Sequence, residues 1–530
     1  MASLTPGSAV RLSVFGCGMP GILAVQMRAD SAITDPGYQD ALGWLYGLSP
    51  NIRTAAQIVA DHPRKLARMR ALLDELGSPD RQFAAVLVAG TKGKGSVAAY
   101  SEAILRAAGV RTGLVTSPHL TSWCERTRIS GQDVEPAMVA RLLPTIRAAV
   151  ERLGDTHADL GQPTTFEAGL AFALVAFAEQ GVQIAVVEAG VGGLHDATNV
   201  LEPLAVALAP ISYDHTATLG PTLTAITSEK TGVFRRGRLA VSAGQPPEAM
   251  IVVERAAREH GARLELLGRA WGWHPESDQA GCGSFEIAGP RGTFSGLTTP
   301  LLGRHQRENA AVAVALVSEV LSLVPVSGQM TMLPTSGPQA GAVVARLRDA
   351  PQGGARPSQT PTANPSLASD PGTLGHAVRT GLASVRWPGR LQVLHEHPWL
   401  VVDGAHNGDS AVRLAEAITE CFGSARRHLI LGTSVGKDVS RMLDALLPIA
   451  ATVTLTRSHH ERSVPLDDLA TMLTARGVPT LVVPEVREAI AGALARATAE
   501  ELVLVTGSLF VVGEALEAFG EGAPAGETTA

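Results

Sequence analysis

The sequence has few cysteines, few aromatic residues and no long apolar run. Its four cysteines, Cys17, Cys124, Cys282 and Cys421, are far apart and form no C-x-x-C pair. This spacing predicts neither a zinc site nor a disulfide framework, and it fits a reducing cytoplasm best. Aromatic residues make up 4% of the chain, which argues against a stacking surface for single-stranded nucleic acid. No run of 18 apolar residues occurs, so we expect no membrane-spanning helix.

Charge and composition limit the protein class further. The net charge is −6 and the pI is about 6.2, which argues against a nucleic-acid surface spread over the whole protein but allows a local anion site. With 530 residues, 45% of them hydrophobic, the chain can build two or three domains with full cores. We therefore expect a cytoplasmic protein that binds neither nucleic acid nor a membrane.

One glycine-rich stretch organises the rest of the chain. An apolar run at 85–89 is typical of a buried parallel strand, and it is followed by the loop GTKGKGS at 90–96 and a helical segment from Val97. A strand, a glycine loop and a helix start together form a phosphate cradle, because backbone N–H groups and the helix dipole face the anion. Lys94 can reach the β- and γ-phosphates, and Ser96 offers a hydroxyl to Mg²⁺.

The loop departs from the strict P-loop pattern G-x-x-x-x-G-K-[ST]. Val88 stands where the first glycine would be, and Gly95 lies between Lys94 and Ser96. The alternative interpretation is a glycine-rich turn with two solvated lysines, since a motif match alone is a hypothesis.

Strands alternate with helices along most of the chain, and this predicts parallel α/β sheets. We expect an α/β fold with a P-loop, parallel-sheet ATPase domain and a smaller, Rossmann-like α/β domain at the C-terminal end. The expected division is a disordered arm at 1–36, an ATP-binding domain at 37–388, a C-terminal ligase domain at 389–520 and a frayed tail at 521–530. A segment rich in Pro, Gly, Ser and Thr, at about 325–375, is predicted to be a low-complexity insertion.

Polar residues cluster where the expected strands of the first domain end. Ser96, Ser117, Glu188 and His215 follow successive strands, and Lys230 lies one helix further on. In a parallel sheet such positions converge along one edge. A bound nucleoside triphosphate would need Mg²⁺, which prefers a hydroxyl, a carboxylate and waters. Taken singly, each residue is more often a turn residue, a cap or a satisfied polar group, so the prediction rests on their joint placement.

Ten motifs in order identify a family resemblance that runs from about residue 38 to 516. The chain resembles the folylpolyglutamate synthase/dihydrofolate synthase family of the Mur ligase superfamily. The motifs are GTKGKGS (90–96), TSPHL (116–120), TTFEAGLAF (164–172), VVEAGVGGLHDATNV (186–200), DHTATLG (214–220), EKTGV (229–233), GRHQRENAAVA (303–313), WPGRLQV (387–393), VVDGAHN (401–407) and LVTGSLFVVGEA (504–515).

The resemblance implies a role for each matching residue. The implied catalytic residues are Lys94, Lys230 and His406, with Lys230 matching a lysine that is carbamylated in the family. The implied ATP-binding residues are Gly93, Lys94, Gly95, Ser96, Asn309, Arg390 and Asp403. The implied Mg²⁺ ligands are Ser96, Ser117, Glu188 and His215. The implied pterin or folate pocket holds Thr164, Phe166, Asp196 and Ala197. Lys92 and the pair Leu194-His195 depart from the family's usual residues.

The implied activity is an ATP-dependent amide ligation. ATP would phosphorylate the carboxylate of dihydropteroate or a folate, and the amine of L-glutamate would displace phosphate from the acyl phosphate. The resemblance also implies a monomer that uses ATP and Mg²⁺. Two alternatives stay open: a Mur-type ligase that adds an amino acid to a cell-wall precursor, and a P-loop nucleotide-binding regulator without ligase chemistry.

Overall fold

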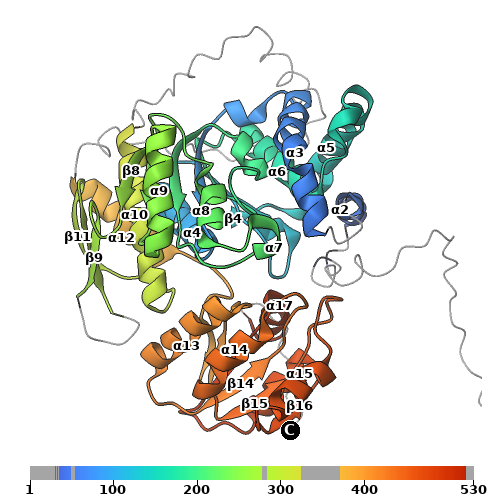
Figure 1. The fold of residues 1–530 in the computed structure, drawn as a ribbon, viewed down its shortest axis with the longest axis vertical. Coiled ribbons are helices and arrows are strands. Elements are labelled where there is room, and N and C mark those ends of the chain that lie inside the picture. Colours follow the sequence, from blue (N-terminus) through green and yellow to red (C-terminus); the bar gives the residue numbers. More distant parts are fainter. Residues whose placement is uncertain are drawn as a thin grey trace, which may run out of the picture.

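The computed structural model describes residues 30, 33, 35–48, 54–276, 283–323 and 371–520. These residues form two lobes, each built on a largely parallel sheet (Figure 1). The predicted α/β fold class is therefore confirmed. Of the predicted arm, residues 1–29, 31, 32 and 34 lie outside the described residues, as do 324–370 of the predicted insertion and the whole predicted tail, 521–530.

The first lobe contains an eight-stranded sheet in the order β4-β3-β2-β5-β1-β6-β7-β8. Strands β2, β5, β1, β6, β7 and β8 run parallel, whereas β3 and β4 are antiparallel. The strands are β1 (Ala84–Ala89), β2 (Thr112–Val115), β3 (Thr127–Ile129), β4 (Gln132–Asp133), β5 (Ile184–Glu188), β6 (Pro203–Leu208), β7 (Leu239–Ser242) and β8 (Arg263–Leu266). The apolar runs of the sequence, such as those of β1 and β5, thus form central strands that are almost entirely buried.

Helices cover both faces of this sheet. One face carries α2 (Pro36–Gly47), α3 (Ala55–Glu75), α5 (Pro136–Thr156), α6 (Thr165–Glu179), α8 (Leu223–Thr231) and α9 (Pro247–His260), and the other carries α4 (Lys94–Ala107), α10 (Arg304–Leu323) and α12 (Pro371–Ser384). Alternate residues of β1 enter the two cores: Leu87 belongs to the first, and Val86 and Val88 to the second. A small antiparallel sheet of β9 (Gly272–Pro275), β10 (Phe285–Gly289) and β11 (Gly292–Leu297) extends the second core.

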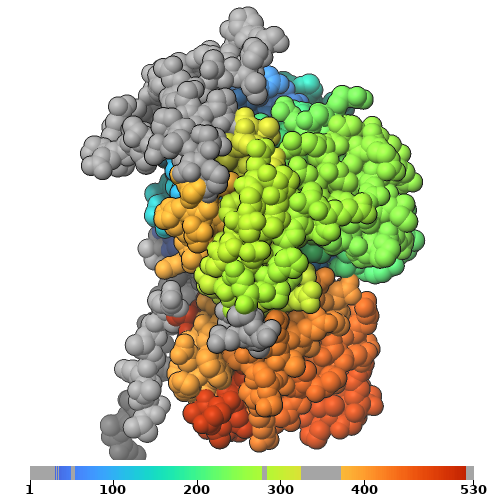
Figure 2. All heavy atoms as spheres, turned by 90° about the vertical axis from the view of Figure 1, so that its left-hand side faces the viewer, coloured from blue at the N-terminus to red at the C-terminus, as the bar shows by residue number. Residues whose placement is uncertain are grey.

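The second lobe contains a six-stranded sheet in the order β12-β13-β17-β14-β15-β16, in which only β12 is antiparallel. Its strands are β12 (Gln392–Glu396), β13 (Trp399–Val402), β14 (Arg427–Leu431), β15 (Thr452–Leu455), β16 (Thr480–Val482) and β17 (Leu502–Thr506). Its helices are α13 (Gly408–Phe422), α14 (Val439–Leu446), α15 (Leu466–Thr474), α16 (Val486–Leu494) and α17 (Leu509–Phe519). Figure 2 shows this lobe, in orange and red, packed under the first.

Two parts of the chain are more ordered than the sequence pattern predicted. Helix α12 begins at Pro371, so the end of the predicted insertion is helical, and Gly381 packs against the backbone of α4 at Ile104. Asp30, within the predicted arm, is buried and accepts hydrogen bonds from the hydroxyls of Tyr38 (2.6 Å) and Ser122 (2.9 Å). Both differences come from tertiary contacts, which local composition does not show.

Candidate active site

The phosphate cradle has the backbone geometry that its glycines allow. Gly90 and Gly93 have φ of 136° and 80°, in the region that favours glycine. A Cβ added at Gly93 would lie 2.3 Å from Oδ1 of Asn309, so this glycine also lets α10 approach the loop. Gly95 admits the ring of Trp387 in the same way, because an added Cβ would lie 2.7 Å from Cζ2. The first turn of α4 leaves backbone N–H groups without helical partners, as an anion site requires.

The expected metal ligands follow four neighbouring strands of the sheet. Ser117, Glu188, Ser96 and His215 follow or end β2, β5, β1 and β6, which is the order of these strands in the sheet. Glu188 is buried, its Oε2 accepts a hydrogen bond from Ser117 N at 3.0 Å, and burial raises its pKa while Lys94 opposes the rise.

His215 is available as a neutral ligand. Burial lowers the pKa of His215 to about 4; Asp214 opposes this shift, and the charges of Lys437, Lys94 and Lys230 add to it, although the ring stays 46% exposed. A neutral imidazole can donate its lone pair to a cation. No group of three or more His, Cys, Asp or Glu side chains with metal-site geometry occurs within the described residues. A single carboxylate with a hydroxyl and an imidazole suits Mg²⁺, which keeps several waters and binds substrate phosphates.

Lys230 lies in the wall of the cradle. It is 3% exposed, and its Nζ donates a 2.6 Å hydrogen bond to the carbonyl of Gly90. Burial lowers the pKa of Lys230 to about 7, and Lys94 contributes to the shift. A substantial fraction of this amine is therefore uncharged and nucleophilic near neutral pH.

The second lobe brings Asp403 and His406 to the same cleft. Asp403 is buried, accepts hydrogen bonds from Leu391 N (2.9 Å) and Ala405 N (2.8 Å), and has its pKa raised by burial. His406 Nδ1 lies 2.8 Å from the carbonyl of Gly404, so Nδ1 carries the proton and Nε2 is free to accept. Burial, with Lys437 and Lys92 nearby, lowers the pKa of His406 to about 3.

Arg390 joins the two groups of residues. Its guanidinium acts electrostatically on Glu188 of the first lobe and on Asp403 and His406 of the second. Lys94 in turn acts on Glu188, His215 and Lys230. The structure therefore gathers the predicted ATP, metal and catalytic residues along one interlobe cleft.

The predicted pterin residues divide into two pairs. Phe166 and Asp196 meet at Gly190, where an added Cβ would lie 3.0 Å and 3.2 Å from their side chains, two residues after Glu188. Thr164 and Ala197 are used structurally: the Thr164 hydroxyl caps α6 by accepting a hydrogen bond from Glu167 N at 3.3 Å, and Ala197 is fully buried. Asp196 is also buried, and its Oδ1 caps the turn Ala197–Val200 by accepting a hydrogen bond from Thr198 N at 3.0 Å.

Sequence reasoning missed the concentration of lysine at this site. The chain has five lysines, Lys65, Lys92, Lys94, Lys230 and Lys437. The last four act on one another or on His215 and Asp214 within the cleft. The sequence does carry a sign of this site, because lysine is rare in the chain and four of its five lysines are the ones gathered here. Such a concentration of positive charge favours a polyanion such as a triphosphate.

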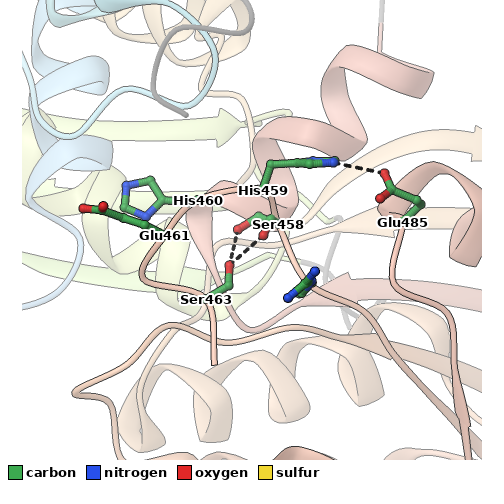
Figure 3. Close-up of a pocket in the computed structure, with 7 residues that line it drawn as sticks. Ser458, His459, His460, Glu461, Ser463 and Glu485 are labelled. Atoms are coloured by element: carbon green, nitrogen blue, oxygen red, sulfur yellow. Dashed lines mark hydrogen bonds and ion pairs between the residues drawn. The ribbon is translucent and has the colours of Figure 1, made fainter. Parts of the chain in front are cut away.

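A second recess lies in the second lobe (Figure 3). It has a volume of about 240 Å³ and is lined by Arg457, Ser458, His459, His460, Glu461, Ser463 and Glu485. His459 points toward Glu485 at 3.2 Å, and the hydroxyls of Ser458 and Ser463 are 2.8 Å apart. Within the described residues, the side chains of Arg457 and Glu461 form no hydrogen bond or ion pair. We call this recess the Arg457 pocket.

The Arg457 pocket adjoins the carboxyl edge of the second sheet. Ser434, in the loop after β14, forms a bridge with Ser463 of the pocket, and its hydroxyl lies 3.1 Å from that of Ser508, after β17. The same loop carries Lys437. The pocket therefore neighbours the loop that carries Lys437.

Comparison with known proteins agrees with this architecture. The family model described as "Mur ligase middle domain" matches residues 88–317, and "Mur ligase, glutamate ligase domain" matches 389–509. The described residues contain no helix with the length and apolar character that a membrane crossing requires. Fold and site thus define a two-lobed Mur ligase.

The individual relatives specify the family. The chain is 29% identical to the dihydrofolate synthase/folylpolyglutamate synthase of Bacillus subtilis over 90% of this chain and 98% of the relative. It is 31% identical to that of Mycobacterium tuberculosis, over 76% of each chain. The structure of Escherichia coli FolC in complex with DHPP and ADP has a TM-score of 0.69, with 26% identity over 90% of this chain and 97% of that one. The chain belongs to the folylpolyglutamate synthase/dihydrofolate synthase family, which confirms the resemblance seen in its motifs.

Proposed function

We propose that the protein is an ATP-dependent ligase that joins L-glutamate to dihydropteroate, to folylpolyglutamates, or to both, through an acyl phosphate. The observation that carries this proposal is the lysine-rich phosphate cradle that faces Asp403 and His406 across the cleft. The relatives' names and the DHPP and ADP bound to the E. coli structure support the substrate class.

The residues of the cleft have separable roles in this reaction. Lys94 and the N-terminus of α4 hold the phosphates, and Arg390 and Asp403 position the nucleotide from the second lobe. Glu188, Ser96, Ser117 and His215 would hold Mg²⁺, which neutralises charge on the transferring phosphoryl group when bound. We also propose that Lys230 is carbamylated, because its pKa of about 7 leaves an uncharged amine that can add CO₂.

The chemistry then follows in two displacements. The substrate carboxylate attacks the γ-phosphorus and ADP leaves, while the lysines stabilise the developing negative charge. The amine of glutamate next attacks the acyl carbon and inorganic phosphate leaves, with Nε2 of His406 placed to accept a hydrogen bond from that amine. Contact between the lobes keeps water away from the acyl phosphate.

We propose that the Arg457 pocket receives the incoming amino acid. Its Arg457, which has no side-chain partner among the described residues, suits a carboxylate of L-glutamate.

Replacing Arg457 by alanine should raise the KM for L-glutamate by about 10- to 100-fold, because a charge-assisted hydrogen bond would be lost. The KM for ATP should change less than about threefold, as measured by steady-state ADP release. Arg476→Ala is the control, since that arginine pairs with Asp444 in the same lobe. An unchanged glutamate KM would remove the pocket from the mechanism.

The proposed function is tested by ADP release from purified protein with ATP, Mg²⁺ and defined acceptors. Release should require both L-glutamate and dihydropteroate or a folate, and mass spectrometry should show a product one glutamyl residue heavier. Release that needs a cell-wall precursor and another amino acid would favour the Mur-type alternative. ATP hydrolysis that is independent of any amino acid would favour the nucleotide-binding regulator.

We further propose that the chain divides into an ATP-binding domain at 37–388 and a ligase domain at 389–520, and that it acts as a cytoplasmic monomer. The two separate sheets and the extents of the two family matches support the division.

A further inference from the structure

Three side chains from distant parts of the sequence meet between the two lobes. Lys92 lies in the phosphate loop, Asp214 lies after β6 in the same lobe, and Asn407 immediately follows His406 in the second lobe. The Nζ of Lys92 is 2.7 Å from Oδ2 of Asp214, and Nδ2 of Asn407 donates to the same oxygen at 3.0 Å. We call this set the interlobe bridge.

The carboxylate at the centre of the interlobe bridge has hydrogen-bond partners on both oxygens, and the bridge is mostly shielded from water. The side chains of Lys92 and Asp214 are 15% and 14% exposed, and Asn407 is buried. The other oxygen of Asp214, Oδ1, accepts a hydrogen bond from His215 N at 2.9 Å. Each oxygen of the Asp214 carboxylate therefore has a donor, Lys92 Nζ on Oδ2 and His215 N on Oδ1. A carboxylate with this charge and this shielding makes a strong, directional acceptor.

Asn407 serves two elements at once. Its Oδ1 accepts from Ser410 N at 3.0 Å and so caps α13, while its Nδ2 reaches across the cleft to Asp214. The orientation of the capping amide is therefore fixed from both sides. Because His406 is the preceding residue, the bridge also fixes where His406 stands relative to the phosphate loop.

We propose that Asp214 is a positioning residue that, through Asn407, holds the second lobe in a fixed position relative to the phosphate loop. Lys92 supplies the positive charge that pairs with the Asp214 carboxylate. Asp214 and Asn407 have no role in the chemistry proposed above. The bridge acts by setting the closed arrangement in which His406 faces the phosphates, and in this respect the inference rests on the proposed function.

The test uses Asn407→Asp in the full chain. An aspartate still caps α13, but it places a carboxylate opposite Asp214, so the lobes should repel each other. We expect a larger radius of gyration by small-angle X-ray scattering without ligands. We also expect kcat to fall about tenfold or more while the KM for ATP changes less than about threefold, as for the loss of a charged hydrogen bond.

The reversed pair provides the rescue. In Asn407→Asp combined with Asp214→Asn, the amide at 214 can donate to the carboxylate at 407 and still accept from His215 N, and Lys92 can pair with the new carboxylate. This double variant should recover the wild-type radius and bring kcat to within about threefold of wild type. Asp409→Asn is the matched control, since Asp409 lies in the first turn of the same helix but pairs with Arg441 of its own lobe at 3.0 Å.

An unchanged radius in Asn407→Asp, or no recovery in the double variant while both retain the wild-type melting temperature, would overturn the proposal. The scattering measurement needs no substrate. If the radius responds as expected and the wild-type protein shows no glutamate-dependent ADP release, the bridge stands and the proposed ligase function fails.

Discussion

Lys230→Ala is expected to lower turnover by about 10³-fold while leaving the Kd for ATP within about threefold of wild type. The side chain is buried against the Gly90 carbonyl and has an amine of lowered pKa, which is the condition for carbamate formation. Alanine removes both the amine and the anionic oxygens that a carbamate would present. Steady-state ADP release and calorimetric titration of a non-hydrolysable ATP analogue measure the two quantities.

Chemical rescue and a control sharpen the Lys230 experiment. A short carboxylate such as acetate can enter the space that the lysine leaves and supply an oxygen anion, so millimolar acetate should restore part of the activity. Lys65→Ala should turn over as wild type, because Lys65 lies on α3, away from the four lysines of the cleft. Wild-type turnover in Lys230→Ala, or no response to any small carboxylate, would contradict the proposed carbamate.

Glu188→Gln is expected to lower turnover by about 10²- to 10³-fold at fixed Mg²⁺ and to raise the Mg²⁺ concentration needed for half-maximal activity by about tenfold. The amide keeps the shape of the side chain and can still accept the hydrogen bond from Ser117 N. The change therefore removes the negative charge and little else. The measurement is turnover across a Mg²⁺ titration at saturating ATP.

Glu102→Gln is the matched control for the Glu188 experiment. Glu102 is also a buried glutamate of the first lobe, but it accepts a hydrogen bond from Thr112 at the start of β2. Thr112 lies at the amino-terminal ends of the parallel strands, whereas Glu188 lies at their carboxyl ends. Replacement of Glu102 should leave the Mg²⁺ dependence unchanged. An unchanged Mg²⁺ dependence in Glu188→Gln would instead exclude Glu188 as a metal ligand.

The sequence predicts the parts of this molecule that depend on local pattern. The apolar run at 85–89 and the glycines after it are enough to predict the strand, the loop and the helix start of the cradle. Parallel strands then require Ser117, Glu188 and His215 to converge at one edge, because their carboxyl ends point the same way.

Contacts between distant side chains are the parts that local pattern could not predict. Asp214 is 122 residues from Lys92 and 193 residues from Asn407. Nothing in the spacing of these residues indicates that one carboxylate oxygen serves both. The burial of Asp30 and the start of α12 at Pro371 are similar cases, since each is stabilised by packing against elements far along the chain.

The distribution of lysine has a practical consequence. Reagents that acylate primary amines will find four of the five ε-amino groups in the nucleotide cleft and one on α3. Labelling that reaches the half-buried Lys94 or Lys437 would therefore modify the catalytic centre, and amine coupling to a sensor surface through these lysines would block it. Attachment through Cys421, which lies on α13 of the second lobe, avoids those lysines.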